Sequence, residues 1–169
     1  MSQFSKTILV SGKNGFIGKN WDNYILKNKI ELNTSRLNSA LINNDNKLDS
    51  LFKNKFGFLH LCGLAHDLKN TNNSKLYYKI NTDYTKKVFD KFLKSETKIF
   101  IFISSVKAVA DSVENILFEK TPPNPQTHYG KSKFLAEKYI LSKKIPDDKK
   151  IYILRPSMVH GPDNKGNFN

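Results

Sequence analysis

The sequence predicts an α/β fold, in which a doubly wound parallel sheet carries helices on both of its faces. Two observations support this prediction. Short apolar runs typical of buried strands alternate with longer segments whose apolar residues recur with helical spacing. The run at 98–104 contains five consecutive apolar residues, which is typical of an inner parallel strand covered by helices on both sides.

Each element can be placed from its own pattern. Strands are expected at residues 7–10, 56–61, 98–104 and 151–154, and a weak one at 30–32. Helices are expected at 16–27, 75–94 and 127–144, the second as one long helix with an apolar face. The Asn-rich stretch 33–49 has no clear period and carries no assignment, and the proline-rich segment 121–125 is expected to be a loop.

Size and charge exclude several classes of protein. The 169 residues suit one domain, and the net charge of +13 comes from scattered lysines with no basic segment interleaved with aromatic residues, so nucleic acid is not expected as a ligand. No apolar run approaches the ~20 residues of a membrane-spanning helix, and no secretion signal is recognised. The single cysteine, Cys62, excludes an internal disulfide, which favours a cytoplasmic location.

The four histidines have no partners at metal-ligand spacing, so no metal site is expected. His60 is expected at the end of a core strand. Residues 161–169 form a Gly/Asn/Pro-rich loop with no closing element. Either this tail is disordered or the chain is part of a longer protein, and we expect the second, with residues 1–169 as one domain.

A glycine turn follows the first predicted strand. Gly12, Gly15 and Gly18 recur at every third position, where Gly12 permits a tight turn, Gly15 lets a pyrophosphate approach and Gly18 lets the helix pack on the sheet. The free N–H groups and partial positive charge of the helix N-terminus favour phosphates. A glycine-rich turn without a ligand is the alternative, but the position directly after the first strand favours a dinucleotide site.

A serine, a tyrosine and a lysine form the second pattern. Tyr129 and Lys133 are four residues apart on a predicted helix and share a face, and Ser105 follows the strongest strand, at the edge where such sheets bind ligands. A nearby ammonium lowers a phenol pKa from about 10, so Tyr129 is predicted to be a general acid/base, with Lys133 lowering its pKa and holding the cofactor ribose. Without the glycine turn and the serine, a tyrosine and a lysine at this spacing are more often an aromatic residue of the core or surface and a solvent-exposed lysine.

Six segments carry a resemblance to a known family: ILVSGKNGFIGKN, FLHLCGLAH, INTDYTKKVF, FIFISSVKAVAD, TPPNPQTHYGKSKFLAEKYI and ILRPSMVHGPDNKGNFN. Together they resemble the extended short-chain dehydrogenase/reductase family, specifically its nucleotide-sugar epimerases, dehydratases and 4-reductases. The resemblance spans the whole chain and implies a Rossmann-type sheet followed by a substrate domain that is missing here. It also leaves a homodimer through helices 75–94 and 127–144 open.

The resemblance implies bound NAD or NADP and hydride transfer at C4 of a nucleotide-diphosphate sugar. It implies that Ser105, Tyr129 and Lys133 are catalytic, with Ser104 as the alternative serine, and that Ser105 and Asn167 bind substrate. Residues expected at the cofactor are Gly12, Asn14, Gly15, Phe16, Ile17, Gly18, Arg36, Leu61, Cys62, Gly63, Asn81, Ser104, Tyr129, Lys133 and Pro156.

The chain departs from the family pattern at two places. Val106-Lys107 stands where a dehydratase usually has Asp-Glu, which favours an epimerase or 4-keto-sugar reductase, in the branch that makes precursors of surface polysaccharides. Arg36 follows the second expected strand where NAD-preferring members carry an acidic residue, so NADP stays open. The alternatives are a non-catalytic dinucleotide-binding module and a generic carbonyl reductase.

Overall fold

A computed structural model describes residues 7–65, 74–114 and 116–163 of the chain. Within them, five parallel strands form one sheet in the order β2-β1-β3-β4-β5. In the described part of the chain this is the Rossmann order 3-2-1-4-5-6 without strand 3, which lies at one edge of the full sheet. The strands are β1 (Thr7–Ser11), β2 (Asn33–Leu37), β3 (Gly57–His60), β4 (Ile99–Ile103) and β5 (Lys150–Leu154).

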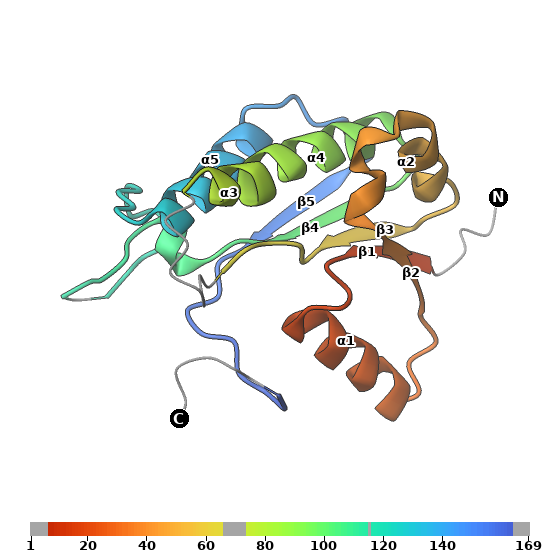
Figure 1. Cartoon of the computed structure of the whole chain (residues 1–169), viewed down its shortest axis with the longest axis horizontal. Helices are drawn as coiled ribbons and strands as arrows, with labels where there is room; N and C mark the ends of the chain where they lie inside the picture. Colours follow the sequence, from red (N-terminus) through yellow and green to blue (C-terminus); the bar gives the residue numbers. More distant parts are fainter. Residues whose placement is uncertain (1–6, 66–73, 115, 164–169) are drawn as a thin grey trace.

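Helices lie on both faces of the sheet, as expected, but unequally. Among the helices of the described residues, α1 (Phe16–Lys27) lies alone on one face, and α2 (Asp45–Phe52), α4 (Tyr84–Lys94) and α5 (His128–Leu141) lie on the other (Figure 1). The chain leaves β1 toward one edge of the sheet and leaves β3 toward the other. The carboxyl ends of β1 and β3 therefore form the switch point at which such sheets bind ligands.

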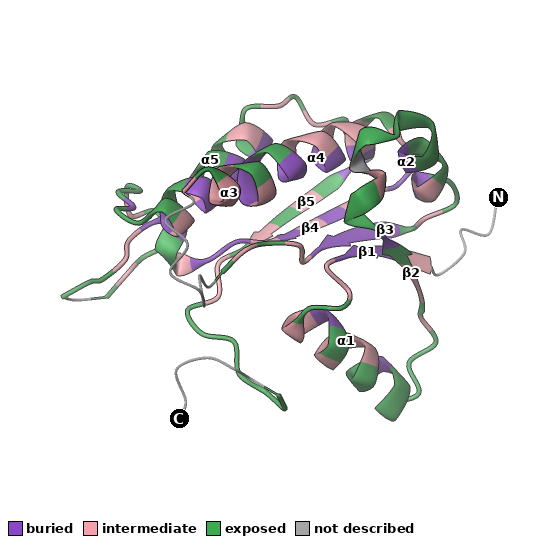
Figure 2. Cartoon of the chain, in the orientation of Figure 1, coloured by how far each residue is buried: buried purple, intermediate pink, exposed green. Residues whose placement is uncertain are grey.

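The core fills the space between the sheet and the larger helix layer. Phenylalanines from β3, β4 and α4 meet there, and the rings of Phe89 and Phe100 lie edge to face with 4.9 Å between their centroids. Figure 2 shows β3 and the inner sides of the helices buried, and β4 buried at alternate residues. Each such ring contributes about 1.5–3 kcal/mol through burial, which fixes α4 and α5 over the strands.

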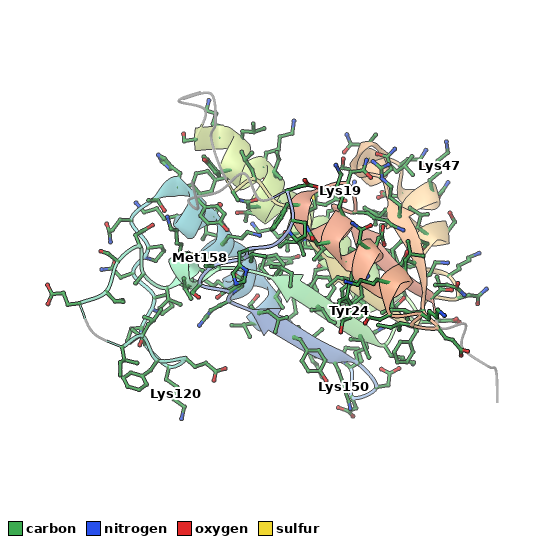
Figure 3. All side chains as sticks on the ribbon, turned by 90° about the horizontal axis from the view of Figure 1, so that it is seen from below. Lys19, Tyr24, Lys47, Lys120, Lys150 and Met158 are labelled. Atoms are coloured by element: carbon green, nitrogen blue, oxygen red, sulfur yellow. The ribbon has the colours of Figure 1, made fainter. Side chains whose placement is uncertain are left out.

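The two faces of the strand expected at 98–104 are covered unequally. Phe100 and Phe102 are fully buried, but the alternate residues of β4 are only partly covered. On the same face, Tyr152 and Leu154 of β5 are 47% and 48% exposed, because α1 lies to one side of these two strands (Figure 3). None of the helices in the described part of the chain is long and apolar enough to cross a bilayer.

The long helix expected at 75–94 is interrupted by a π-helical turn. The segments are α3 (Ser74–Tyr77), the π turn η2 (Tyr78–Asp83) and α4. The wide turn leaves both Asn81 and Thr82 buried, and their side chains contact Ser132 of α5. Such turns often occur at functional sites, and this one fixes α5 against the end of β3.

The second strand lies at Asn33–Leu37 and not at the expected 30–32. The strand β2 begins only at Asn33, and Leu37 is its one buried residue, because the edge of the sheet leaves polar side chains in contact with solvent. The unassigned stretch 33–49 also holds a 3₁₀ turn (Ser39–Asn43) and the start of α2. Asn44 caps α2 by accepting a hydrogen bond from the Lys47 amide at 3.0 Å, so a capping signal was present in the sequence.

Candidate active site

The glycine turn lies at the switch point of the sheet. Gly12 has a φ of +71°, and a Cβ there would lie 2.7 Å from the Cys62 amide nitrogen and 2.8 Å from the Leu61 carbonyl carbon. Only glycine tolerates both the conformation and this approach. The backbone after β1 is therefore packed directly against the backbone after β3, as a dinucleotide site requires.

Gly15 and Gly18 shape the start of α1. Gly15 is the N-cap residue, and no side chain caps this end of the helix, whose first turn contains Phe16 and Ile17. A Cβ on Gly18 would lie 2.6 Å from the Lys13 carbonyl carbon. We expected Gly18 to allow contact between the helix and the sheet, but the nearest atoms belong to Lys13, so this glycine lets the turn fold over the helix.

Two cations stand beside the turn at the end of β2. The Lys13 ammonium donates a hydrogen bond to Thr34 Oγ1 at 2.6 Å and lies 3.3 Å from an Asp22 carboxylate oxygen. The Arg36 guanidinium is exposed, and the Asn14 side-chain oxygen accepts from its two terminal nitrogens at 3.1 and 3.0 Å. Among the described residues Arg36 forms no ion pair, so its charge is uncompensated at the mouth of the turn.

A buried hydrogen-bond chain, which the sequence did not reveal, supports the switch point. The Thr85 hydroxyl donates to the Asn81 carbonyl at 2.7 Å, so it accepts from His60 Nε2 at 2.8 Å. His60 Nδ1 then carries no proton and accepts from the Ser11 hydroxyl at 2.6 Å, and Ser11 Oγ accepts from the Cys62 amide at 3.3 Å. Burial lowers the pKa of His60 to about 3, with Lys133 adding to this effect, so the ring is neutral.

Asn81 connects three elements. Its side-chain oxygen accepts from the Leu64 amide at 2.7 Å, and its nitrogen donates to the Leu64 carbonyl at 3.0 Å and to Ser132 Oγ at 2.9 Å. The Ser132 hydroxyl donates onward to the Tyr129 carbonyl at 2.8 Å. Both amide protons of Asn81 are thus used within the protein, and its direct contact with a cofactor stays a prediction.

The structure brings Ser105 and Tyr129 together. The α5 helix begins after Thr127, whose hydroxyl accepts from the Gly130 amide at 3.1 Å, and this places Tyr129 in the first turn. Ser105 follows β4 and accepts from the Lys107 amide at 3.2 Å. Burial raises the pKa of Tyr129, and a hydrogen bond with the Ser105 side chain acts in the opposite direction.

Lys133 lies one turn further along α5 and is 4% exposed. Its ammonium donates to the Ile103 carbonyl at 2.9 Å and lies 4.8 Å from the centroid of the Phe102 ring. A Cβ on Gly63 would lie 2.9 Å from this nitrogen, so glycine makes room for the lysine. Burial lowers the pKa of Lys133 to about 8, against the effects of Cys62 and Glu137.

The surroundings of the Tyr129 phenol act on its pKa. Burial raises this pKa, and Tyr77 adds to the increase. The lowering of the pKa by Lys133 stays a prediction for the cofactor-bound protein. The Tyr77 ring packs against Tyr129 with 6.3 Å between centroids, a contact that the sequence did not reveal. The phenol therefore stays protonated in the resting protein.

The remaining predicted residues lie in different settings. Ser104 is buried, and its hydroxyl has no hydrogen-bond partner in the described part of the chain. The Pro156 carbonyl accepts from the Val106 amide at 3.2 Å, beside Ser105. Asn167 lies outside the described residues. The geometry thus favours Ser105 over Ser104 as the serine that reaches Tyr129.

The sequence matches the profile of the NAD dependent epimerase/dehydratase family over residues 8–169. The chain belongs to this family. The chain is similar to the UDP-glucose 4-epimerase of Vibrio cholerae, with 31% identity over 179 residues that cover 96% of this chain and 55% of that protein. A second relative, the N-acetyl-alpha-D-glucosaminyl-diphospho-ditrans,octacis-undecaprenol 4-epimerase of Escherichia coli O157:H7, is 35% identical over 96 residues, 56% of this chain and 29% of that protein.

Solved structures share the fold of this epimerase/dehydratase family member. A dTDP-4-dehydrorhamnose reductase from Clostridium acetobutylicum gives a TM-score of 0.75 at 22% identity, with 96% of this chain and 56% of that one covered. UDP-glucuronic acid 4-epimerase from Bacillus cereus, in complex with NAD, gives 0.74 at 22% identity, with 94% and 58% covered. The chain therefore spans about half the length of the proteins that it matches.

Proposed function

We propose that this chain is the cofactor-binding part of an enzyme that uses NAD or NADP to epimerise or reduce a diphosphate-linked sugar at C4. The observation that carries the proposal is that the first turn of α5, which holds Tyr129 one turn before Lys133, packs directly on the segment after β4 that begins with Ser105. A Cβ on Gly130 of this turn would meet the Lys107 carbonyl. The glycine turn opens at the same edge. A module that only binds a dinucleotide has no need of this set.

The residues at the switch point fit a dinucleotide. Gly12 lets the turn pack directly on the backbone after β3, and the N-terminus of α1 adjoins this turn without a side-chain cap. Backbone N–H groups and the helix dipole favour a pyrophosphate at such a place. One of the three donors of the Lys133 ammonium is used on Ile103, which leaves two for ribose hydroxyls.

The side chains then divide the proton chemistry. When bound, the nicotinamide supplies the hydride donor or acceptor. Burial keeps the Tyr129 phenol protonated, which is the form that gives a proton to the C4 oxygen when a keto sugar is reduced. In the reverse direction the phenolate takes that proton. The Ser105 hydroxyl donates a hydrogen bond to the same oxygen and holds it beside Tyr129.

The substrate is proposed from the relatives. The Vibrio cholerae protein is named for UDP-glucose and the Escherichia coli protein for a sugar diphospho-undecaprenol, so both names share a sugar on a diphosphate. Val106-Lys107 in place of an acidic pair favours epimerisation or reduction over dehydration. We propose a cytoplasmic role in making precursors of surface polysaccharides, with a homodimer as one assembly.

Calorimetric titration with NAD⁺, NADH, NADP⁺ and NADPH tests the site in the 169-residue chain. Binding of at least one of the four is expected, with similar affinity in Tyr129→Phe, because the phenol oxygen acts on the sugar. In the complete protein, Tyr129→Phe should lower kcat by about 100-fold or more, the usual contribution of a general acid/base. No binding by a folded chain, or a normal kcat in Tyr129→Phe, would contradict the proposal.

A further inference from the structure

One carboxylate joins the segment that follows β4 to the start of α5. Asp111 Oδ2 accepts hydrogen bonds from the amides of Gln126 and Thr127 at 2.6 and 3.1 Å, and Oδ1 accepts from the Thr127 hydroxyl at 2.6 Å. That hydroxyl accepts in turn from the Gly130 amide at 3.1 Å, one residue beyond Tyr129. Asp111 is thus connected to the first turn of the helix through the residue that caps it.

Backbone contacts reinforce this junction. The Asn124 amide donates to the Val109 carbonyl at 2.8 Å. A Cβ on Gly130 would meet the Lys107 carbonyl and would lie 3.0 Å from the Pro125 Cβ, so the first turn of α5 lies directly on the segment after β4. The position of one segment along the other is therefore set at this place.

Each of the two segments carries one hydroxyl of the proposed reaction. Ser105 caps the 3₁₀ turn that follows β4, where its hydroxyl accepts from the Lys107 amide at 3.2 Å, and Tyr129 lies in the first turn of α5. Because the two residues are 24 positions apart in the chain, contacts between the segments decide how their hydroxyls are aligned. Asp111 contributes a charged side chain to these contacts.

The Asp111 carboxylate is ionised at neutral pH. Burial acts to raise the pKa of Asp111. The hydrogen bonds from Thr127 and from the Gln126 amide act in the opposite direction, with Lys107 adding to them, so the pKa lies below its ordinary value. Hydrogen bonds to an ionised acceptor are about twice as strong as those between neutral groups, and a negative charge also complements the helix dipole at the N-terminus of α5.

We propose that Asp111 is a positioning residue that holds the Tyr129 phenol in line with Ser105 by anchoring the first turn of α5. The oxygens of its carboxylate are engaged by residues 126 and 127, so it acts on the reaction through Thr127 and not by contact with the sugar. This role rests on the proposed function, because the alignment of the two hydroxyls matters only where both meet the same sugar oxygen.

The anchor can be measured in the 169-residue chain without turnover. Asp111→Ala should speed hydrogen exchange of the Gln126 amide by about tenfold or more, because that amide loses a charged acceptor. The ring-proton shifts of Tyr129, which packs against Tyr77, should change as well. Glu114→Ala removes an exposed carboxylate from the same loop and is the matched control for both. Unchanged exchange and unchanged shifts in folded Asp111→Ala would overturn the proposal.

Turnover of the complete protein measures the alignment. A displacement of about 1 Å can cost about 100-fold in rate, so Asp111→Ala should lower kcat by about 10- to 100-fold. The KM for the cofactor should stay within about twofold, because Lys133 is held separately by the Ile103 carbonyl. Asp111→Asn keeps an oxygen for the two amides and a nitrogen that can donate to the Thr127 hydroxyl, so it should retain more of kcat than Asp111→Ala.

The background of Tyr129→Phe separates alignment from general stability. If Asp111 acts through the phenol, Asp111→Ala should lower kcat no further once the phenol oxygen is removed. Equal factors of loss in both backgrounds would show a role in stability alone and would overturn the proposal. A normal kcat in Tyr129→Phe would contradict the proposed function itself, whereas a low kcat in Tyr129→Phe with a normal one in Asp111→Ala would contradict only the positioning role.

Discussion

Lowering the pH from 7 to 5 should destabilise this fold through His60. The imidazole is fully buried at the end of β3 and is held neutral by Ser11 on one nitrogen and Thr85 on the other. The Ser11 hydroxyl already donates its proton to Nδ1 of the ring. A second ring proton would have to occupy the same position between Nδ1 and the Ser11 oxygen. Protonation therefore breaks the chain of hydrogen bonds that supports the glycine turn.

The magnitude follows from the difference between the two states. The pKa of His60 is about 3 in the folded protein and 6.5 in the unfolded chain. Above pH 6.5 both forms are neutral and nothing is lost. Below pH 6.5 the imidazole of the unfolded chain binds a proton, whereas that of the folded protein stays neutral. The free energy of unfolding therefore falls by about 1.4 kcal/mol per pH unit. Between pH 7 and 5 this amounts to about 2 kcal/mol.

Other groups leave this interval largely unaffected. Lys133, with a pKa of about 8, is charged in the folded and unfolded chains alike between pH 5 and 7. The lowered pKa of Asp111, held by hydrogen bonds from Thr127 and from the Gln126 amide, affects stability only at more acidic pH. The loss expected between pH 7 and 5 therefore reports mainly on His60.

Urea unfolding followed by the fluorescence of Trp21, the single tryptophan, measures the effect. His60→Gln should be less stable at both pH values but should lack the loss of about 2 kcal/mol between them, because glutamine does not ionise. His128→Gln, which removes an exposed histidine, should keep that loss. Equal losses in the unmodified chain and in His60→Gln would refute a neutral, buried His60.

Two further substitutions test the dinucleotide site. Gly12→Ala should lower the free energy of unfolding by about 2 kcal/mol or more and abolish cofactor binding, because its Cβ would meet the Cys62 backbone at a positive φ. Gly57→Ala, whose Cβ would have contacts of 3.6 Å or longer, is the control for both the urea unfolding and the calorimetric titration. In calorimetric titrations Arg36→Ala should weaken the affinity for NADP⁺ by about tenfold and leave the affinity for NAD⁺ unchanged, since a guanidinium recognises a 2′-phosphate. Equal losses of affinity for both cofactors, or a similar loss in Lys19→Ala, which removes an exposed lysine, would exclude this role.

The sequence predicted the elements whose patterns are local. The run at 98–104 is apolar whatever surrounds it, and the helix 16–27 has the bounds of α1, because its spacing places apolar residues on one face. The weak strand at 30–32 and the unassigned 33–49 stretch failed for the opposite reason. At the edge of a sheet, β2 needs only one buried residue, Leu37, so its sequence lacks the alternation of a buried strand.

Charge and proton positions needed the tertiary structure. The i, i+4 spacing placed Tyr129 and Lys133 on one face, yet only packing decides whether a phenol is buried and which charges act on it. Glu137 lies at the same spacing, and nothing in its local sequence shows that Arg155 neutralises it from β5.

The sequence by itself determined the alternation of strands and helices outside residues 30–52, the glycine turn and the chemical groups available at the end of the sheet. These depend on residue type and spacing along the chain. The three-dimensional structure decided that Ser105 meets Tyr129, that Lys133 lies against Gly63 and that His60 connects Ser11 to Thr85. Each of these contacts joins residues that are 24 or more positions apart in the sequence. Burial sets the protonation of the ionisable groups among them, because it removes the water that would otherwise stabilise their charged forms.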